Sequence, residues 1–143
     1  MAFPDRIERT VELAHPPRKV WAALTTAEGL GTWFGNRATV DLRPGGAAEL
    51  VWASGDKAEL RIERIEEPAV FGFTWHIHGL SDDDPRRTYV EFTHEPAGAG
   101  TRLTVVESGF AQLAEDAYRA AYGGNVEGWK HELDELVAYL DAA

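Results

Sequence analysis

The spacing of apolar residues changes twice along this chain, and each change marks a different kind of element. In RIERTVEL, residues 6–13, Ile7, Val11 and Leu13 share one alternate phase, while two glutamates and a threonine occupy the other. A period of two is the pattern of a strand with one buried face. This segment therefore predicts a first β-strand.

Helical spacing follows directly. Two consecutive prolines come next, and the first turn of a helix tolerates proline. The stretch PRKVWAALTT then places Val20, Trp21 and Leu24 at helical spacing, and EGLGTWFG predicts a second short helix that is closed by Gly35. We therefore expect two short helices after the first strand.

From residue 36 the period returns to two. Six further strands are predicted, in the segments NRATVDL, AAELVWA, KAELRIERIEE, VFGFTWHIH, TYVEFTHE and TRLTVVES. The segments between them, such as RPGG, SGD and PAGAG, are rich in turn residues. Connections this short favour antiparallel neighbours, so the six strands should form a meander. The first strand has no hairpin partner and is expected to close the sheet beside the seventh.

The chain ends in an amphipathic pattern. One apolar stripe at helical spacing contains Val126, Trp129, Leu133, Leu136, Val137 and Leu140. Asn125 can serve as its N-cap, so the pattern predicts a long helix that begins near this residue. The upstream segment AQLAEDAYRAAY is also helical in character, and Gly123–Gly124 is expected to break or kink the join.

Length and composition limit the function classes. A chain of 143 residues has the usual size of one domain, so residues 1–143 are read as a single domain. The net charge of −10 disfavours nucleic acid and anionic membrane surfaces as partners. No cysteine is present, which excludes disulfides and thiolate chemistry. Because the amino terminus lacks a signal-peptide pattern and no apolar run approaches roughly 20 residues, a cytoplasmic location is expected.

Several stretches carry a resemblance to a known family. HPPRKVWAALTTAEGLGTWFG resembles the opening of the activator of heat-shock-protein-ninety ATPase homologue family, within the SRPBCC (START and birch-pollen-allergen) superfamily. GTRLTVVESGF resembles its last strand and GWKHELDELVAYL its closing helix. The resemblance implies an α+β helix-grip fold of the single-domain bacterial type. In that fold a seven-stranded antiparallel sheet curves around a long carboxy-terminal helix and leaves a cavity between them.

The apolar phases also predict strand register. Trp75 is expected opposite Phe92, and Phe92 opposite Val105, because this puts the most apolar faces on one side. The other expected rows are Ile77 with Val90 and Glu107, Phe73 with His94 and Leu103, Leu60 beside Trp75, and Ile62 beside Phe73. A one-residue slip would turn each set outward, so burial should hold the register firmly.

Two polar residues, His94 and Glu107, fall on this apolar face. Burial of an ionised group without a partner is costly. One interpretation places His94 in water at a strand end and pairs Glu107 with an arginine, for which Arg9 is a candidate, or with a helix amide. The other makes both residues the polar groups that orient a ligand in an apolar cavity.

The candidate ligand-binding residues share that face or the two helices that should cover it. They are Trp33, Phe34, Leu60, Ile62, Phe73, Trp75, Ile77, Val90, Phe92, His94, Val105, Glu107, Trp129 and Leu133. One stripe of helix side chains cannot cover a curved sheet of seven strands. We therefore expect the rings of Phe73 and Trp75 to line a cavity and not to complete a solid core.

No metal or cofactor is expected. His76 and His78 lie two apart on one strand, but no third ligand accompanies them and their phase should face solvent. The acidic run from Asp82 to Asp84 lacks the spacing of a calcium-binding loop.

Three functions remain open. The first is a module that binds a small hydrophobic or amphipathic molecule. The second is an enzyme, since the resemblance extends to polyketide cyclases and dehydratases, with Glu107 and His94 as acid–base candidates. The third is a chaperone ATPase activator or stress-response protein, which is disfavoured because eukaryotic activators carry a separate amino-terminal domain. A homodimer is left open.

Overall fold

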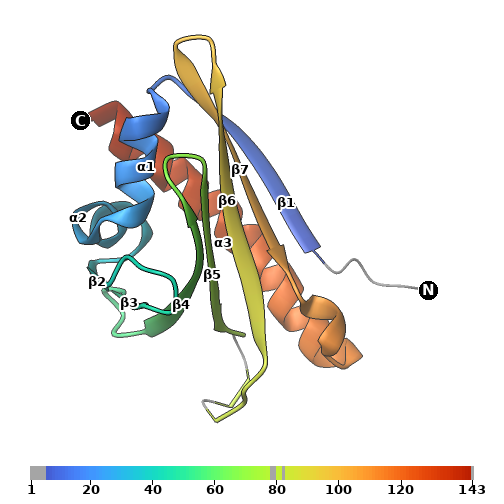
Figure 1. Cartoon of the computed structure of the whole chain (residues 1–143). Coiled ribbons are helices and arrows are strands. Elements are labelled where there is room, and N and C mark those ends of the chain that lie inside the picture. The colour runs from blue at the N-terminus through green and yellow to red at the C-terminus, as the bar shows by residue number, and fades with distance from the viewer. Residues whose placement is uncertain (1–5, 78–79, 82, 143) are drawn as a thin grey trace.

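The computed structural model describes residues 6–77, 80–81 and 83–142. A seven-stranded antiparallel sheet in the order β1-β7-β6-β5-β4-β3-β2 lies against one long helix (Figure 1). The strands are β1 (Arg6–Leu13), β2 (Arg37–Val40), β3 (Ala47–Val51), β4 (Lys57–Glu66), β5 (Val70–His76), β6 (Arg87–Ala97) and β7 (Gly100–Ser108). The helical elements are α1 (Pro17–Thr25), α2 (Ala27–Gly29), η1 (Leu30–Phe34), η2 (Phe110–Gln112) and α3 (Glu115–Ala142). The expected α+β helix-grip fold is confirmed, and β1 pairs with β7 as predicted.

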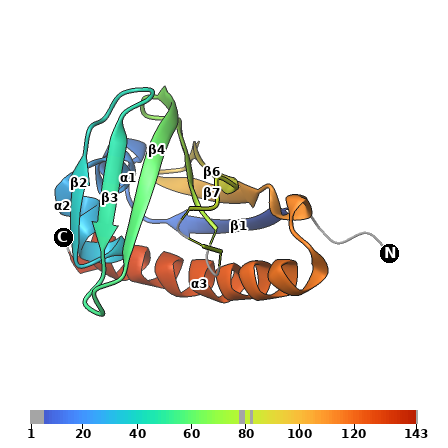
Figure 2. The same cartoon turned by 90° about the horizontal axis from the view of Figure 1, so that it is seen from below.

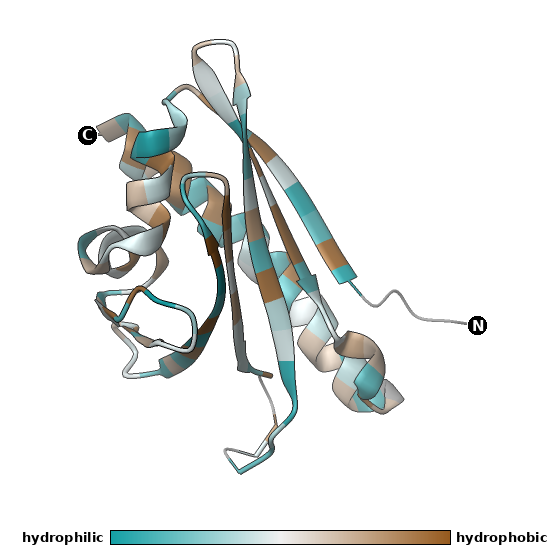
Figure 3. Cartoon of the chain, viewed as in Figure 1, coloured by the Kyte–Doolittle hydropathy of each residue, from teal (hydrophilic) through white to brown (hydrophobic). Residues whose placement is uncertain are grey.

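The sheet curves strongly over α3. Figure 2 shows β2, β3 and β4 running nearly across the direction of β1 and β7, with α3 along one face. Such curvature follows from the right-handed twist that accumulates between neighbouring strands. In Figure 3, apolar and polar positions alternate along the strands, as a sheet with one buried face requires. Within the described ranges, no helix combines the length and hydropathy that a bilayer crossing requires.

The final helix begins earlier than predicted. It starts at Glu115 instead of near Asn125 and continues through both glycines. A glycine costs a helix only about 0.5–1 kcal/mol relative to alanine, and burial of the preceding turns offsets that cost. Tyr118 and Ala121 are buried, and the Tyr118 ring packs edge-on against Phe110. Asn125 is therefore an internal helix residue and not a cap.

Most of the predicted register is confirmed, but one strand pair is shifted. The confirmed pairs are Phe92 with Val105, Val90 with Glu107, His94 with Leu103, Leu60 with Trp75, and Ile62 with Phe73. The pairing of Trp75 with Phe92 was wrong, since Phe92 lies opposite Phe71 and Trp75 lies opposite Thr88. Apolar phase fixes which face a residue occupies but cannot detect an offset of four residues. Ile77 is buried beyond the end of β5 and does not share a row with Val90.

Candidate functional site

The centre of the site is a fully buried carboxylate. Glu107 of β7 has 0% of its surface exposed. The indole N–H of Trp129 donates to its Oε1 at 2.9 Å, and that of Trp75 donates to its Oε2 at 2.8 Å. The Asn125 side-chain amide lies 2.9 and 3.0 Å from the two oxygens, and the Thr88 hydroxyl donates to Oε2. Glu107 thus joins β5, β6 and α3 through one group.

These donors explain how a carboxylate is tolerated there. Indole and amide N–H groups can only donate, so both oxygens of Glu107 are occupied as acceptors. Hydrogen bonds to an ionised acceptor are stronger than neutral ones and offset part of its desolvation. The suggested pairing with Arg9 was wrong, because Arg9 is exposed and lies opposite Val105. With both oxygens occupied, Glu107 holds its neighbours in place and does not offer a free acid or base.

The Glu107 hydrogen bonds fix two indole rings. Trp75 and Trp129 stack with their centroids 5.7 Å apart and their planes at 27°. Phe34 packs against both, at 5.8 Å from Trp75 and 5.6 Å from Trp129, and meets Trp52 edge-on at 6.0 Å. Three indoles and one phenyl ring therefore form a single aromatic cluster between the sheet and α3.

Phe34 reaches this cluster from an unusual turn. The Gly35 N–H donates to the Leu30 carbonyl at 2.9 Å, a bond that spans five residues and widens the helix to a π-turn. The adjacent Trp33 is anchored by its indole N–H, which donates to the Ala23 carbonyl at 2.7 Å. Single π-turns are frequent at functional sites. Here the turn points Phe34 at the tryptophans.

A cavity of about 190 Å³ lies beside the cluster. Its lining consists of Phe34, Trp52, Trp75, Asn125, Gly128, Trp129 and Glu132. Cavities of about 150 Å³ accept benzene in other proteins, so this one can hold an organic group of similar or slightly larger size. A Cβ placed on Gly128 would meet no atom within 4 Å, so the missing side chain leaves open space in the cavity.

Glu132 is the one ionisable residue among those that line this cavity. It is partly buried, and its Oε2 is buried without a hydrogen-bond partner among the described residues. Burial, and secondarily the negative charge of Glu135, raise the pKa of Glu132 to about 7. This carboxyl, unlike Glu107, is available to a bound molecule.

A second cavity of about 670 Å³ adjoins the first and shares Trp52, Trp75 and Asn125 with it. The rest of its lining is mostly polar and comprises Ser54, Asp56, Lys57, Ala58, Glu59, His76, Leu80 and Arg87. The aromatic cavity therefore continues into a wider space that carries charges of both signs.

The structure separates the expected ligand-binding residues into two groups. Phe34, Trp75 and Trp129 line the aromatic cavity, and Glu107 lies behind the two indoles. The others pack in the core: Trp33, Leu60, Ile62, Phe73, Ile77, Val90, Phe92, His94, Val105 and Leu133. Phe73, expected to line a cavity with Trp75, is 1% exposed and belongs to the lining of neither cavity. Ligand binding by any of these residues stays a prediction.

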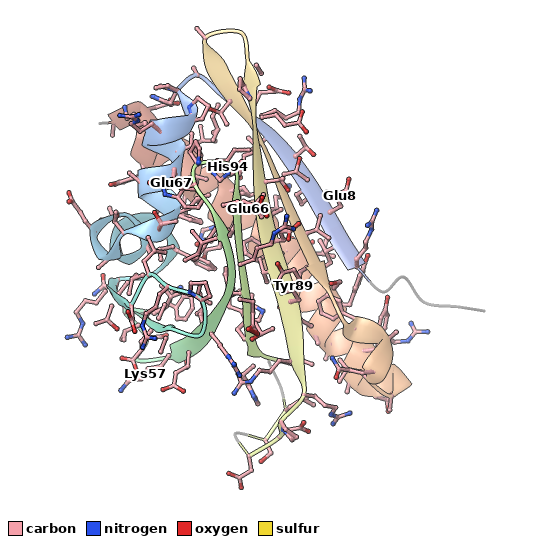
Figure 4. The ribbon with its side chains drawn as sticks, in the orientation of Figure 1. Glu8, Lys57, Glu66, Glu67, Tyr89 and His94 are labelled. Atoms are coloured by element: carbon pink, nitrogen blue, oxygen red, sulfur yellow. The ribbon has the colours of Figure 1, made fainter. Side chains whose placement is uncertain are left out.

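His94 does not share a site with Glu107. The two lie on neighbouring strands four residues apart in register, which is about 13 Å at about 3.3 Å per residue. Figure 4 shows His94 and Lys57, a residue of the larger cavity, toward opposite ends of the sheet. His94 is 5% exposed and not in water, its ring lies 5.7 Å from Trp21, and its Nδ1 is 3.1 Å from the Ala69 carbonyl. Burial lowers the pKa of His94, so the neutral ring fits this environment.

The metal candidates are only partly described. The His76 Nε2 lies 3.1 Å from the Leu80 carbonyl, whereas His78 and Asp82 fall outside the described residues. Asp84 forms an ion pair with Arg86. Among the residues that the structure describes, no three histidine, aspartate or glutamate side chains gather as a metal site would need.

The sequence reasoning missed part of the site. Asn125, Gly128 and Glu132 are spaced three and four apart, which places them on one helix face beside Trp129. That spacing was a usable signal, but Asn125 was considered only as an N-cap, and Gly128 and Glu132 were not considered because the helix was judged by its apolar residues. Trp52 follows β3 at a turn and carried no such signal.

A curved sheet that grips one long helix, with a small cavity between them, defines a helix-grip domain. Residues 14–141 match the sequence profile of the family described as activator of Hsp90 ATPase homolog 1-like protein, and the chain belongs to that family. A search of curated proteins finds no match.

Solved structures share this fold. Protein MLL2253 from Mesorhizobium loti is 26% identical, with 96% of this chain and 98% of that chain covered and a TM-score of 0.82. DynU16, a protein of the dynemicin biosynthetic locus, is 21% identical over 97% of this chain and 48% of its own, with a TM-score of 0.80. An Aha1 dimer from Colwellia psychrerythraea, solved in solution, is 18% identical over 94% and 95% of the two chains, with a TM-score of 0.76. The last two likenesses concern the fold alone.

Proposed function

We propose that this protein binds a small, largely apolar molecule in the aromatic cavity beside α3. The observation that carries the proposal is an aromatic lining beside open space, with few polar groups. Ligand sites of this kind combine apolar walls with a small number of polar groups that set orientation. Rings that face open space lack contacts on that side, and a molecule of matching shape would supply them.

The site is also formed in advance of binding. Glu107 holds Trp75 and Trp129 by their N–H groups, so two sides of the cavity keep their position without a ligand. A preformed site loses less conformational freedom on binding, which leaves more of the interaction energy as affinity.

Gly128 offers a direct test, because a side chain there would occupy the cavity without striking other atoms. Thermal unfolding is measured with indole, naphthalene and benzyl alcohol. We expect at least one probe to raise the midpoint of the wild type, since a ligand at 100 times its Kd adds about 2.7 kcal/mol. Gly128→Leu should abolish that shift.

Gly124→Leu is the matched control, because Gly124 lies in the same helix, also has no atom within 4 Å of a built Cβ, and is not part of the cavity lining. It should keep the shift. If no probe stabilises the wild type, or if both variants respond alike, the proposed site is wrong.

A second function, acid–base catalysis, is favoured by Glu132. A carboxyl with a pKa raised to about 7, beside a cavity lined mostly by aromatic residues, has the properties of a general acid or base. The structural similarity to DynU16, from a biosynthetic locus, supports a test with aromatic polyketides. Turnover that is lost in Glu132→Gln while the probes still bind would support an enzyme, whereas binding without turnover would support a carrier.

Self-association was left open from the sequence and a chaperone partner was disfavoured, and both need a direct test. The Colwellia protein is described as a dimer, which supports a light-scattering measurement of this one. The family description supports a pull-down assay for a heat-shock ATPase.

A further inference from the structure

The aromatic cavity has a distinctive electrostatic lining. The face of an aromatic ring carries negative potential, which is strongest for indole, and its edge carries positive potential. Three indoles and a phenyl ring line the cavity, with Phe34 within 6.0 Å of each tryptophan centroid. A positive charge held against the open face of one of these rings is therefore attracted to it.

The N–H groups of two of these indoles do not face the cavity. The N–H groups of Trp75 and Trp129 both donate to Glu107, which is fully buried and is not part of the cavity lining. The most positive atoms of these rings therefore contact a carboxylate, and carbon atoms are left to line the cavity. The described hydrogen-bond donors to Glu107 are all neutral, so no cationic side chain is paired with it among them.

Glu132 supplies a carboxyl oxygen without a partner at the same place. Its Oε2 is buried and accepts no hydrogen bond from a described residue, and no lysine, arginine or histidine lines the cavity. Burial raises the pKa of Glu132. A buried carboxyl without a counter-ion shows such a shift, and a bound cation would reverse it.

We propose that the cavity binds an organic cation, with an alkylated ammonium group among Phe34, Trp52, Trp75 and Trp129 and against the carboxyl of Glu132. The inference rests on the proposed function and narrows its ligand to one chemical class. Aromatic rings that surround a quaternary ammonium are an established mode of recognition, and the attraction is strongest when the cation is desolvated.

The dimensions agree with such a group. The volume of about 190 Å³ suits a trimethylammonium or benzylic amine head and not a long chain. The remainder of a larger ligand would pass Asn125 into the adjoining cavity of about 670 Å³.

The test compares choline with its neutral carbon isostere, in which a tert-butyl group replaces trimethylammonium. Both are titrated calorimetrically at about pH 8, above the pKa of Glu132, so that the carboxyl is ionised. We expect choline to bind more tightly by at least about tenfold, because only the cation interacts with the ring faces and the carboxylate. Equal or tighter binding of the isostere overturns the inference.

Glu132→Gln keeps the shape of the side chain and removes its charge. We expect choline to lose roughly tenfold in affinity in this variant and the isostere to be unaffected, since only a charged partner feels the change. Glu127→Gln, an exposed position on the same helix, is the matched control and should change neither. Unchanged choline binding in Glu132→Gln also overturns the inference.

The outcomes distinguish failure of the organic-cation inference from failure of the proposed ligand-binding function. If apolar probes bind in a manner sensitive to Gly128→Leu but choline does not, the cation inference fails and the binding function stands. If neither choline nor any apolar probe binds, both fail.

Discussion

Glu107 is an acceptor surrounded by donors, and its chemistry depends on having two oxygens. In Glu107→Gln one oxygen becomes an NH₂ group that would face an indole N–H or the Asn125 amide. A buried donor left without an acceptor costs about 1–3 kcal/mol. We therefore predict that Glu107→Gln lowers the free energy of unfolding by about 2–3 kcal/mol, measured by urea denaturation.

Glu95→Gln is the matched control, because Glu95 is an exposed residue of the neighbouring strand β6. Its free energy of unfolding should stay within about 0.5 kcal/mol of the wild type. Equal stability of the Glu107 and Glu95 variants would show that the buried carboxylate is dispensable.

Glu132 predicts a pH dependence of stability. Its pKa is about 7 in the folded chain against an ordinary value of 4.5. Between these values the folded state retains a proton that the unfolded state has released, so stability from this group falls as pH rises. The contribution is complete below pH 4.5 and is lost as pH passes 7.

Denaturation curves of wild type and Glu132→Gln between these pH values test this expectation. The stability of the wild type relative to the variant should decline with rising pH. A constant difference would mean that Glu132 titrates normally. The comparison must be relative because His94 acts in the opposite direction: burial lowers its pKa, and stability from His94 is lost as pH falls below its ordinary range.

At the scale of elements, α3 contains glycines that its packing does not require. A Cβ on Gly124 would meet no atom within 4 Å. We predict that Gly124→Ala raises the free energy of unfolding by about 0.5–1 kcal/mol, because alanine restricts the unfolded chain and favours the helix. Chemical denaturation would measure the gain. Gly29→Ala should be destabilising in contrast, since its Cβ would lie 2.5 Å from the Ala23 carbonyl oxygen. A loss of stability in Gly124→Ala would contradict the described space around that residue.

The strands and helices also show which structural features the sequence could predict. Alternation correctly predicted seven strands and the buried face that it assigned to β4, β6 and β7, because burial enforces parity. The β5–β6 offset could not be predicted from alternation, since the connection from His76 to Arg87 is longer than the two-residue turns that fix hairpin register. The start of α3 was missed because local glycine propensity was weighed without the burial of Tyr118 and Ala121.

At the scale of the whole molecule, the location of the cavity could not be read from the strand pattern. The sequence marked Glu107 as a polar residue on an apolar face, but its partners come from β5, β6 and α3 and meet only in the folded chain. The cavity likewise depends on a π-turn at one side and on Gly128 at the other. The structure has a cavity beside α3, but Phe73, which was expected to line a cavity, is buried and lines neither one.

The paired indoles have an optical consequence. Two identical chromophores held 5.7 Å apart with their planes at 27° couple their excited states, and the coupling depends steeply on separation and angle. The pair should therefore produce an exciton couplet in the circular dichroism spectrum. A molecule that binds in the cavity beside these rings would alter the couplet without any added label. Because the hydrogen bonds that Trp75 and Trp129 donate to Glu107 hold the two rings in place, a change in the couplet would report ligand binding.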